Sequence, residues 1–347
     1  MQPDAPVNDA AAASSQEFGL IAAIPEQWRK PLAVLAAVFA VLGVVTAREW
    51  GEMFHQWWNI DTYNHILLVP LIAVWLVWLK ADECVRVTPR SWGWGLALIG
   101  CGLLLWSVGR ISGINLLAHA GAVGVMQAAI VTVLGVRASV LLALPIAYLT
   151  FLVPFGDEII PMLQAITAEI AIALTHWSGI PAVIDGIFID TPVGLFIVAE
   201  ACSGVKFLVA MITLSVLVGF TRFKSWNRRA IFFAASVVVP IIANGIRAWG
   251  TIYIAQFAGV EFAAGFDHIF YGWIFFALVV ILVLAGAWRF FEMEPDEYGF
   301  TPEELGEMTI LQRFEAKEES LLVILAAVVA LAIVAAVVVA ILSPAAV

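Results

Sequence analysis

The sequence predicts an all-α polytopic membrane protein with about nine transmembrane helices. Of its 347 residues, 63% are hydrophobic and only 13% are charged, whereas soluble domains carry about 25% charged residues. Apolar runs of about 17 to 25 residues recur along the chain, and each is long enough to cross a bilayer as a helix. We expect no nucleic-acid partner. The net charge of −10 says little about this, because residues 292–319 alone contain ten acidic residues.

The chain begins with residues 1–28, which we expect to be a disordered cytoplasmic tail. Residues 1–25 contain no Lys or Arg, so they lack the basic start of a signal peptide. Apolar runs that we predict to be spans follow near 31–47, 63–79, 93–109, 113–134, 138–154, 203–221, 229–249, 267–288 and 320–342.

Lys and Arg residues in the short loops orient these spans, because such residues stay on the cytoplasmic side. All but four of the 17 basic residues share one side if the N-terminus is cytoplasmic. The four that remain on or near the other side are Arg48, Arg110, Lys206 and Arg247.

The alternation of inside and outside along the chain leaves residues 159–178 on the outer side. The fifth predicted span ends outside, and the sixth must start outside to bring Arg222 and Arg229 to the cytoplasm. Polar residues such as Gln164 and Glu169 interrupt the apolar run. We therefore expect an interfacial or re-entrant outer-face helix. The alternative is that 159–178 crosses and a later span is wrongly assigned.

Residues 184–198 combine β-formers with Asp-Gly, Asp-Thr-Pro and Val-Gly turns, which predicts a short extracytoplasmic β-hairpin. Residues 291–319 are rich in acidic side chains and form a predicted cytoplasmic loop. In the final stretch, 320–347, residues 321–342 are all Ala, Val, Leu or Ile, as is typical of a C-terminal transmembrane anchor. The remaining part, 29–290, is the predicted transmembrane catalytic domain.

Three polar residues, Cys202, Arg247 and His268, stand at the edges of three consecutive predicted spans. Cys202 precedes Arg222 by 20 residues, Arg247 follows Arg229 by 18, and His268 precedes Arg289 by 21. At about 1.5 Å per residue these separations come to roughly 27 to 32 Å, about one hydrocarbon thickness. The three residues are therefore expected to share one depth, at the outer interface.

A thiol, a guanidinium and an imidazole at one place can act together on an acyl group. An imidazole can take the proton of a thiol, the thiolate can attack a carbonyl carbon, and a guanidinium can stabilise the oxyanion that forms. Each residue alone has a plainer explanation: small-residue packing for the Cys, and a polar head at the lipid surface for the Arg and His. Cys202 also has no disulfide partner expected on its own side, since Cys84 is predicted to be cytoplasmic and Cys101 to lie inside a span.

Neighbouring residues could support this chemistry. Asn244 lies one turn before Arg247 and could orient it, and Asp267 and Tyr271 flank His268. Next to Cys202, Gly204 would let a substrate backbone approach closely. Glu200 and Ser203, on either side of the thiol, are further candidates for supporting it or for binding substrate. The five histidines are dispersed, so we predict neither a metal site nor a cofactor.

Three motifs together resemble the exosortase family, most closely the proteobacterial exosortase A type that is associated with exopolysaccharide loci. They are Glu200–Gly204 (EACSG), Asn244–Arg247 (NGIR) and Asp267–Trp273 (DHIFYGW), with further matching stretches at Tyr63–Pro70 (YNHILLVP) and Pro154–Glu158 (PFGDE). The resemblance covers most of residues 60–290.

The resemblance implies a sortase-like cysteine transpeptidase or peptidase of the bacterial inner membrane, with its active site facing the periplasm. It implies that Cys202 is the nucleophile, that Arg247 stabilises the oxyanion or substrate, and that His268 is the general acid and base. The implied substrates are secreted proteins with a PEP-CTERM sorting tail, which comprises a Pro-Glu-Pro motif, a transmembrane segment and a basic end. A lipid- or polysaccharide-linked acceptor would receive them, and membrane lipid would surround the enzyme.

Two other functions remain open from the residues alone. An intramembrane cysteine protease with water as acceptor would need the same acyl-enzyme. A non-enzymatic component of exopolysaccharide export or assembly would show charged residues at mid-bilayer and internal repeats, and neither is apparent in the sequence.

Overall fold

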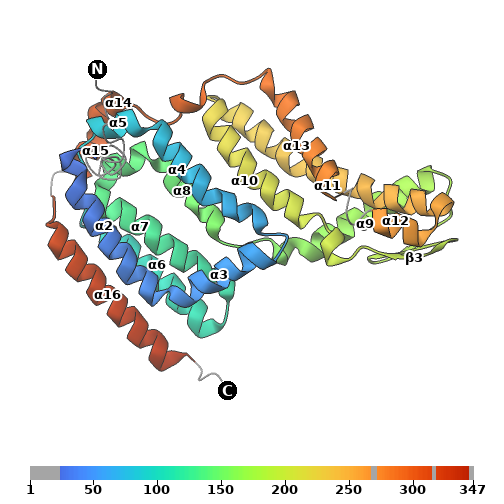
Figure 1. The fold of residues 1–347 in the computed structure, drawn as a ribbon, viewed down its shortest axis with the longest axis horizontal. Coiled ribbons are helices and arrows are strands. Elements are labelled where there is room, and N and C mark those ends of the chain that lie inside the picture. Colours follow the sequence, from blue (N-terminus) through green and yellow to red (C-terminus); the bar gives the residue numbers. More distant parts are fainter. Residues whose placement is uncertain (1–23, 267–271, 315–317, 344–347) are drawn as a thin grey trace, which may run out of the picture. The chain divides into compact units, whose positions relative to one another are not determined.

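The computed structural model describes residues 24–266, 272–314 and 318–343 (Figure 1). These residues are mainly helical, which confirms the all-α polytopic fold. Seven helices in the described part of the chain are long and apolar enough to cross a membrane, or eight if a pair bent by 109° forms one span. The predicted number of nine is not confirmed. The chain divides into two compact units, which are described separately below.

The first unit comprises residues 1–47, 80–146 and 300–347. Its helices are α2 (Glu26–Val45), α5 (Ala81–Arg86), α6 (Gly95–Ser112), α7 (Asn115–Leu141), α14 (Pro302–Glu307), α15 (Thr309–Phe314) and α16 (Leu321–Leu342), and the short α8 (Ala143–Tyr148) follows α7. Helices α6 and α7 pack closely because glycines remove side chains from their interface. A Cβ added to Gly109 would come within 2.3 Å of the Ala118 backbone nitrogen, and one on Gly121 within 2.4 Å of the Trp106 nitrogen.

The predicted spans 113–134 and 138–154 differ from the helices that form there. Helix α7 continues to Leu141, with one non-helical residue, Gly135, at a φ of 81°. The carbonyl of Arg90 lies so close to Gly135 that a Cβ there would be 1.7 Å from its oxygen. The helical stretch that follows, Ala143–Leu152, is shorter than a span requires. An intruding backbone carbonyl at Gly135 thus produces a break that hydropathy alone does not locate.

The second unit comprises residues 48–79 and 147–299. Its α-helices are α3 (Ala47–Asn59), α4 (Val69–Leu79), α9 (Ile160–Trp177), α10 (Val205–Arg222), α11 (Trp226–Ala258), α12 (Val260–Phe266) and α13 (Gly272–Trp288). Its 3-10 turns are η1 (Asn64–Leu68), η2 (Leu149–Leu152), η3 (Asp157–Ile159), η4 (Glu200–Cys202) and η6 (Pro295–Glu297). The bent pair consists of α3 followed by η1 and α4. Of the predicted span 267–288, residues 267–271 lie outside the described part.

Helices α10, α11 and α13 lie side by side, and their basic ends meet (Figure 1). Glu292, just past α13, accepts hydrogen bonds from the backbone N–H groups of Ser225 and Lys224, at 2.8 and 2.7 Å. It also forms a 3.0 Å ion pair with Arg228. These backbone donors, together with the arginine charge, hold the pKa of the Glu292 carboxyl below its usual value. The contacts join the ends of α10, α11 and α13, as expected if all three share one membrane side.

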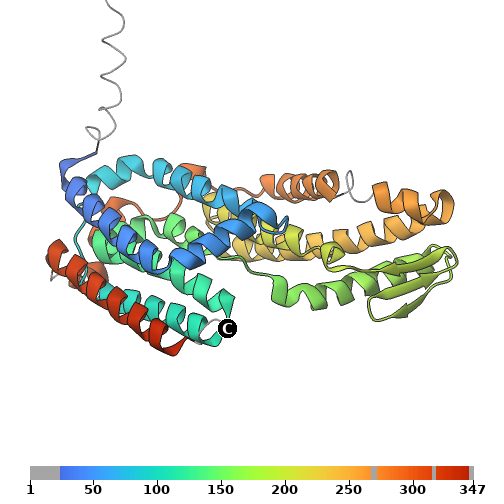
Figure 2. The same ribbon diagram turned by 60° about the horizontal axis from the view of Figure 1, so that its bottom comes forward.

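Helix α11 has 33 residues and is therefore about 50 Å long, well beyond a hydrocarbon thickness of about 30 Å. Its C-terminal part packs along α9 (Figure 2). The start of α9, at Ile160 and Leu163, clusters with Val237 and Ile241 of α11. At the other end of α9, the indole N–H of Trp249 donates to the Ser178 hydroxyl at 2.9 Å.

Helix α9 therefore accompanies α11 only from its middle to beyond Arg247. A helix that starts at mid-depth and ends outside would have this placement, which favours the re-entrant arrangement. Asp157–Trp177 is nevertheless long and apolar enough to cross, so the absence of a crossing stays a prediction.

The predicted hairpin forms and gains a third strand. Strands β1 (Val183–Asp185), β2 (Phe188–Thr191) and β3 (Gly194–Ile197) make an antiparallel sheet in the order β1-β2-β3. Each turn has two residues, because Asp185 pairs with Phe188 and Thr191 with Gly194. Gly186, the first turn residue, has a φ of 59°, a conformation that glycine adopts without a Cβ clash. Residue Ile189 of β2 is fully buried against Ala168 and Ile172 of α9, so the sheet rests on that helix.

Candidate active site at the start of helix α10

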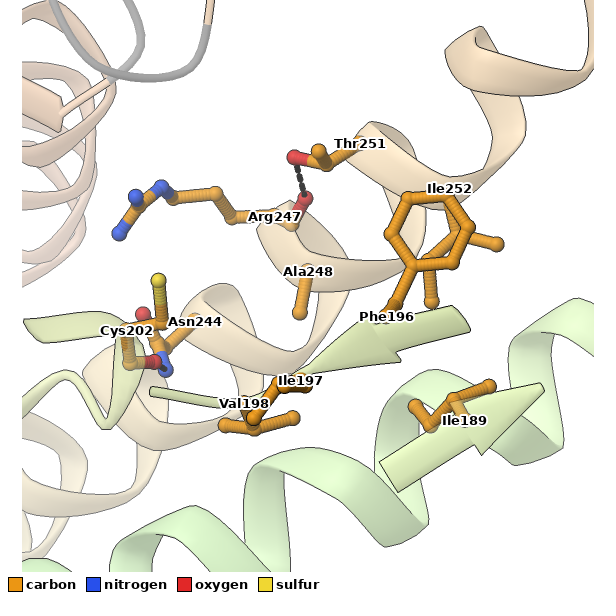
Figure 3. Close-up of a pocket in the computed structure, with 10 residues that line it drawn as sticks. All are labelled: Ile189, Phe196, Ile197, Val198, Cys202, Asn244, Arg247, Ala248, Thr251 and Ile252. Carbon is orange, nitrogen blue, oxygen red and sulfur yellow. Dashed lines mark hydrogen bonds between the residues drawn. The ribbon is translucent and has the colours of Figure 1, made fainter. Parts of the chain in front are cut away.

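A small pocket of about 70 Å³ lies between β3, η4 and α11 (Figure 3). Its polar lining residues are Cys202, Asn244, Arg247 and Thr251. The rest of the wall is apolar. It includes Phe196 and Ile197 of β3, Val198 directly after that strand, and Ala248 and Ile252 of α11. Two of the three predicted catalytic residues, Cys202 and Arg247, thus border one cavity.

Cys202 ends the single turn η4, which connects the sheet to α10. Its backbone N–H donates to the carbonyl of Ala199 at 2.8 Å, and that of Ser203 donates to Glu200 at 3.0 Å. Ser203 is buried, and its hydroxyl accepts a hydrogen bond from the Val205 N–H at 3.3 Å. Glu200 is exposed and does not line the pocket. The thiol therefore stands on a tight turn just before the α10 N-cap, Gly204, rather than inside a helix.

Asn244 fixes this turn from α11. Its side-chain N–H₂ donates to the Cys202 carbonyl at 2.8 Å and to the Thr167 hydroxyl at 3.0 Å. On the other side of the turn, Gln164 donates to the Val198 carbonyl at 2.7 Å. Helices α9 and α11 thereby hold both ends of the segment that carries the thiol. The Asn244 side-chain oxygen is buried, and it has no hydrogen-bond partner among the described residues.

Gly204 is required where the turn approaches Asn244. Its φ is 83°, and an added Cβ would lie 2.7 Å from the Asn244 side-chain carbon Cγ. Gly179 offers a matched comparison, since its φ is 77° and a Cβ there would meet nothing within 4 Å. An alanine at either position would be held in an unfavourable left-handed conformation, but only an alanine at position 204 would also collide with Asn244.

We expect Gly204→Ala to destabilise the protein more than Gly179→Ala. A left-handed alanine costs about 1–2 kcal/mol at either position, and the collision with Asn244 adds about 1–3 kcal/mol at residue 204. Thermal unfolding of the two purified variants in the same detergent measures the difference. Equal melting temperatures would show that Asn244 moves aside without cost.

Arg247 lies one helical turn after Asn244, and its side chain is largely buried. Its guanidinium carbon is 5.9 Å from the centre of the Phe207 ring. In Figure 3 the guanidinium and the Cys202 sulfur extend to the same side of the pocket. A thiol beside a buried cation can form a tetrahedral adduct at a carbonyl carbon whose oxyanion the cation stabilises. Charge interactions of this kind gain strength where water is excluded.

The other predicted site residues have different outcomes. His268, Asp267 and Tyr271 lie outside the described residues, so their predicted roles stay predictions. Of the neighbours predicted around the thiol, Asn244 contacts the Cys202 turn directly, and Ser203 and Gly204 belong to it. Among the described residues, no three His, Cys, Asp or Glu side chains come together as metal ligands would.

Sequence reasoning missed the contribution of α9 and β3 to this site. In the sequence, Gln164 and Thr167 are simply two polar residues within an apolar run. Their spacing of three residues places them on one helix face, and that face meets both Val198 and Asn244. Polar residues three apart in an otherwise apolar helix are the signal that could have identified them.

Residues 57–285 match the family described as transmembrane exosortase (Exosortase_EpsH). No curated protein and no solved structure matches the chain. The family match spans more than half of the 347 residues and contains both Cys202 and Arg247. The chain therefore belongs to the transmembrane exosortase family and is a multi-pass membrane protein.

Proposed function

We propose that this exosortase is a cysteine transpeptidase that cleaves the C-terminal sorting signal of secreted proteins and transfers them to an acceptor. The observation that carries the proposal is the shared pocket of Cys202 and Arg247. A nucleophile and an oxyanion stabiliser are two parts of an acyl-transfer site. Membership of a family of cysteine-dependent processing enzymes supports the same assignment.

The first chemical step forms a thioester. The Cys202 thiol loses its proton to His268, and the sulfur attacks the carbonyl carbon of the scissile peptide bond. The Arg247 guanidinium stabilises the resulting oxyanion. When the tetrahedral adduct collapses, the carbon–nitrogen bond breaks, and His268 returns the proton to the leaving amine. The C-terminal fragment departs, and the secreted protein stays attached to Cys202.

The second step releases the enzyme. A nucleophilic group on a lipid- or polysaccharide-linked acceptor attacks the thioester carbon, and His268 takes its proton. The carbon–sulfur bond then breaks, and the thiol is restored. Water in place of the acceptor would give a free carboxylate, which is the protease alternative.

The proposed location is the bacterial inner membrane, with a cytoplasmic N-terminus and a periplasmic active site. Support comes from the basic ends of α10 and α11, which lie one hydrocarbon thickness from the pocket by helix rise. A substrate whose basic end stops at the cytoplasmic face would present its Pro-Glu-Pro motif at the height of Cys202. This geometry suits a PEP-CTERM sorting tail.

Mass spectrometry of a reporter protein tests the proposal. The reporter is a secreted domain that ends in a Pro-Glu-Pro motif, a transmembrane segment and a basic end, and it is produced in the cells that naturally contain this enzyme and its acceptor, with Cys202 intact or replaced. We expect a shortened C-terminus joined to an added group. Adding hydroxylamine to purified membranes should convert part of the product to a hydroxamate, because hydroxylamine intercepts a thioester.

Each outcome of this experiment has one meaning. A shortened C-terminus with a free carboxylate and hydroxamate trapping supports the protease alternative. A shortened C-terminus without any trapping contradicts the thioacyl-enzyme. An intact tail, with the enzyme present in the membrane, contradicts the proposed function.

A further inference from the structure

Strand β3 is an edge strand that leads directly to the thiol. Among the residues that the structure describes, it pairs with β2 alone, because the sheet order is β1-β2-β3. From the end of β3, two residues reach the η4 turn that carries Cys202. Ile197, the last residue of β3, lines the same pocket as Cys202. The edge and the thiol therefore border one cavity.

The pairing with β2 shows which backbone groups of β3 face outward. In an antiparallel pair, hydrogen-bonded and non-hydrogen-bonded residue pairs alternate. The Val198 N–H donates to the Ile187 carbonyl at 2.9 Å, so the pairs Ile189–Phe196 and Thr191–Gly194 are the bonded ones in this register. The backbone groups of Leu195 and Ile197 consequently point away from β2.

Three of these outward groups are available for pairing. Within the described residues, the Leu195 N–H, the Leu195 carbonyl and the Ile197 N–H have no hydrogen-bond partner, whereas the Ile197 carbonyl accepts from Ala199 at 3.0 Å. Leu195 and Ile197 are 58% and 52% exposed. A row of donors and acceptors at every second residue is what an added strand requires.

We propose that the extended segment of the substrate that precedes the scissile bond binds as an additional strand on the free edge of β3. This inference rests on the proposed function, because it names the substrate as the occupant. The reason for that choice is continuity: a chain paired with Leu195 and Ile197 continues along the pocket wall to Cys202. An attacked peptide must also be extended where it meets the nucleophile, since a helical segment hides its carbonyls in internal hydrogen bonds.

Strand pairing explains how the site would accept many secreted proteins. Main-chain hydrogen bonds bind any sequence, and only alternate side chains of the added strand face the enzyme. Phe196 and Ile252 belong to the apolar wall of the pocket, which is the surface that such a side chain would meet next to Cys202. Recognition would then come from backbone pairing and one small pocket, rather than from a long series of side-chain contacts.

Leu195→Pro tests the edge on the enzyme. Proline removes the outward N–H without removing a hydrogen bond to β2, and proline is tolerated on such an edge. We expect the rate of reporter cleavage to fall about tenfold, as the loss of roughly one hydrogen bond and a steric block would produce. Leu195→Ala is the matched comparison, because it removes the leucine side chain but keeps the N–H, and the proposal requires Leu195→Pro to lose clearly more activity than Leu195→Ala. Equal rates for the two variants, or an unchanged rate for Leu195→Pro, would overturn the proposal.

A proline scan of the reporter tests the same proposal if Leu195→Pro fails to fold. Proline is placed one position at a time along the segment that precedes the cleaved bond. Strand pairing predicts that cleavage falls at every second position, because alternate N–H groups face the enzyme. Uniform effects, or effects at a single position only, would contradict it. If unmodified reporter is never cleaved, the proposed function fails, and if it is cleaved without alternation, only the edge-strand inference fails.

Discussion

Cys202→Ala is expected to abolish cleavage of the reporter protein, with a rate loss on the order of 10⁴-fold or more. The thiol is the only group in the proposed mechanism that forms a bond to the substrate, and alanine offers no replacement. The pocket and its hydrogen bonds should persist, because Asn244 bonds to the Cys202 backbone carbonyl and not to the thiol. Quantifying intact and shortened reporter over time by mass spectrometry measures the loss.

Cys101→Ala is the matched control for this experiment. Cys101 is an exposed free cysteine on α6, far in sequence from the pocket residues, and its replacement should leave the cleavage rate within about twofold. Substantial cleavage by Cys202→Ala at normal protein levels would remove the thiol from the mechanism and with it the transpeptidase proposal.

Arg247→Gln is expected to lower the rate constant of cleavage by about 10²- to 10³-fold, as loss of an oxyanion-stabilising group does. Glutamine keeps polar atoms at this position on α11 but carries no charge. Arg247→Lys should recover part of the rate, since an ammonium supplies charge without the planar fork of donors. Measuring the rate at several reporter concentrations separates an effect on turnover from one on binding.

Lys206→Gln controls for the general loss of a positive charge in this region. The Lys206 ammonium lies 5.2 Å from the centre of the same Phe207 ring that Arg247 approaches, but Lys206 does not line the pocket. We expect its cleavage rate to stay within about threefold of the unchanged protein. If both variants lose the same activity, Arg247 acts through the overall field and not on the oxyanion.

The fold class and the depth of the site could be predicted because they follow from simple distances. Apolar length and basic loops predicted the helices that pack as α10, α11 and α13. Helix rise from Arg222 and Arg229 predicts that Cys202 and Arg247 share one depth, but not that they lie side by side. In the structure both residues line one pocket, and Asn244 joins the two segments.

The remaining parts depend on contacts between segments far apart in sequence. The interruption of helix α7 at Gly135 exists because the Arg90 carbonyl lies against that residue, and the sequence around Gly135 does not predict it. The requirement for Gly204 comes from Asn244, 40 residues later in the chain. The third strand and the role of α9 likewise arise from tertiary packing, which hydropathy does not measure.

The unbroken length of α11 has a consequence for the membrane around the protein. One helix joins Arg229, near its basic end, to Arg247 at the pocket, so the helix rise separates these two residues by about 27 Å. This distance sets the bilayer thickness that suits the protein. A thicker or thinner bilayer would shift the height of a substrate's transmembrane segment relative to the thiol. We therefore expect the rate of cleavage to depend on the thickness of the surrounding bilayer.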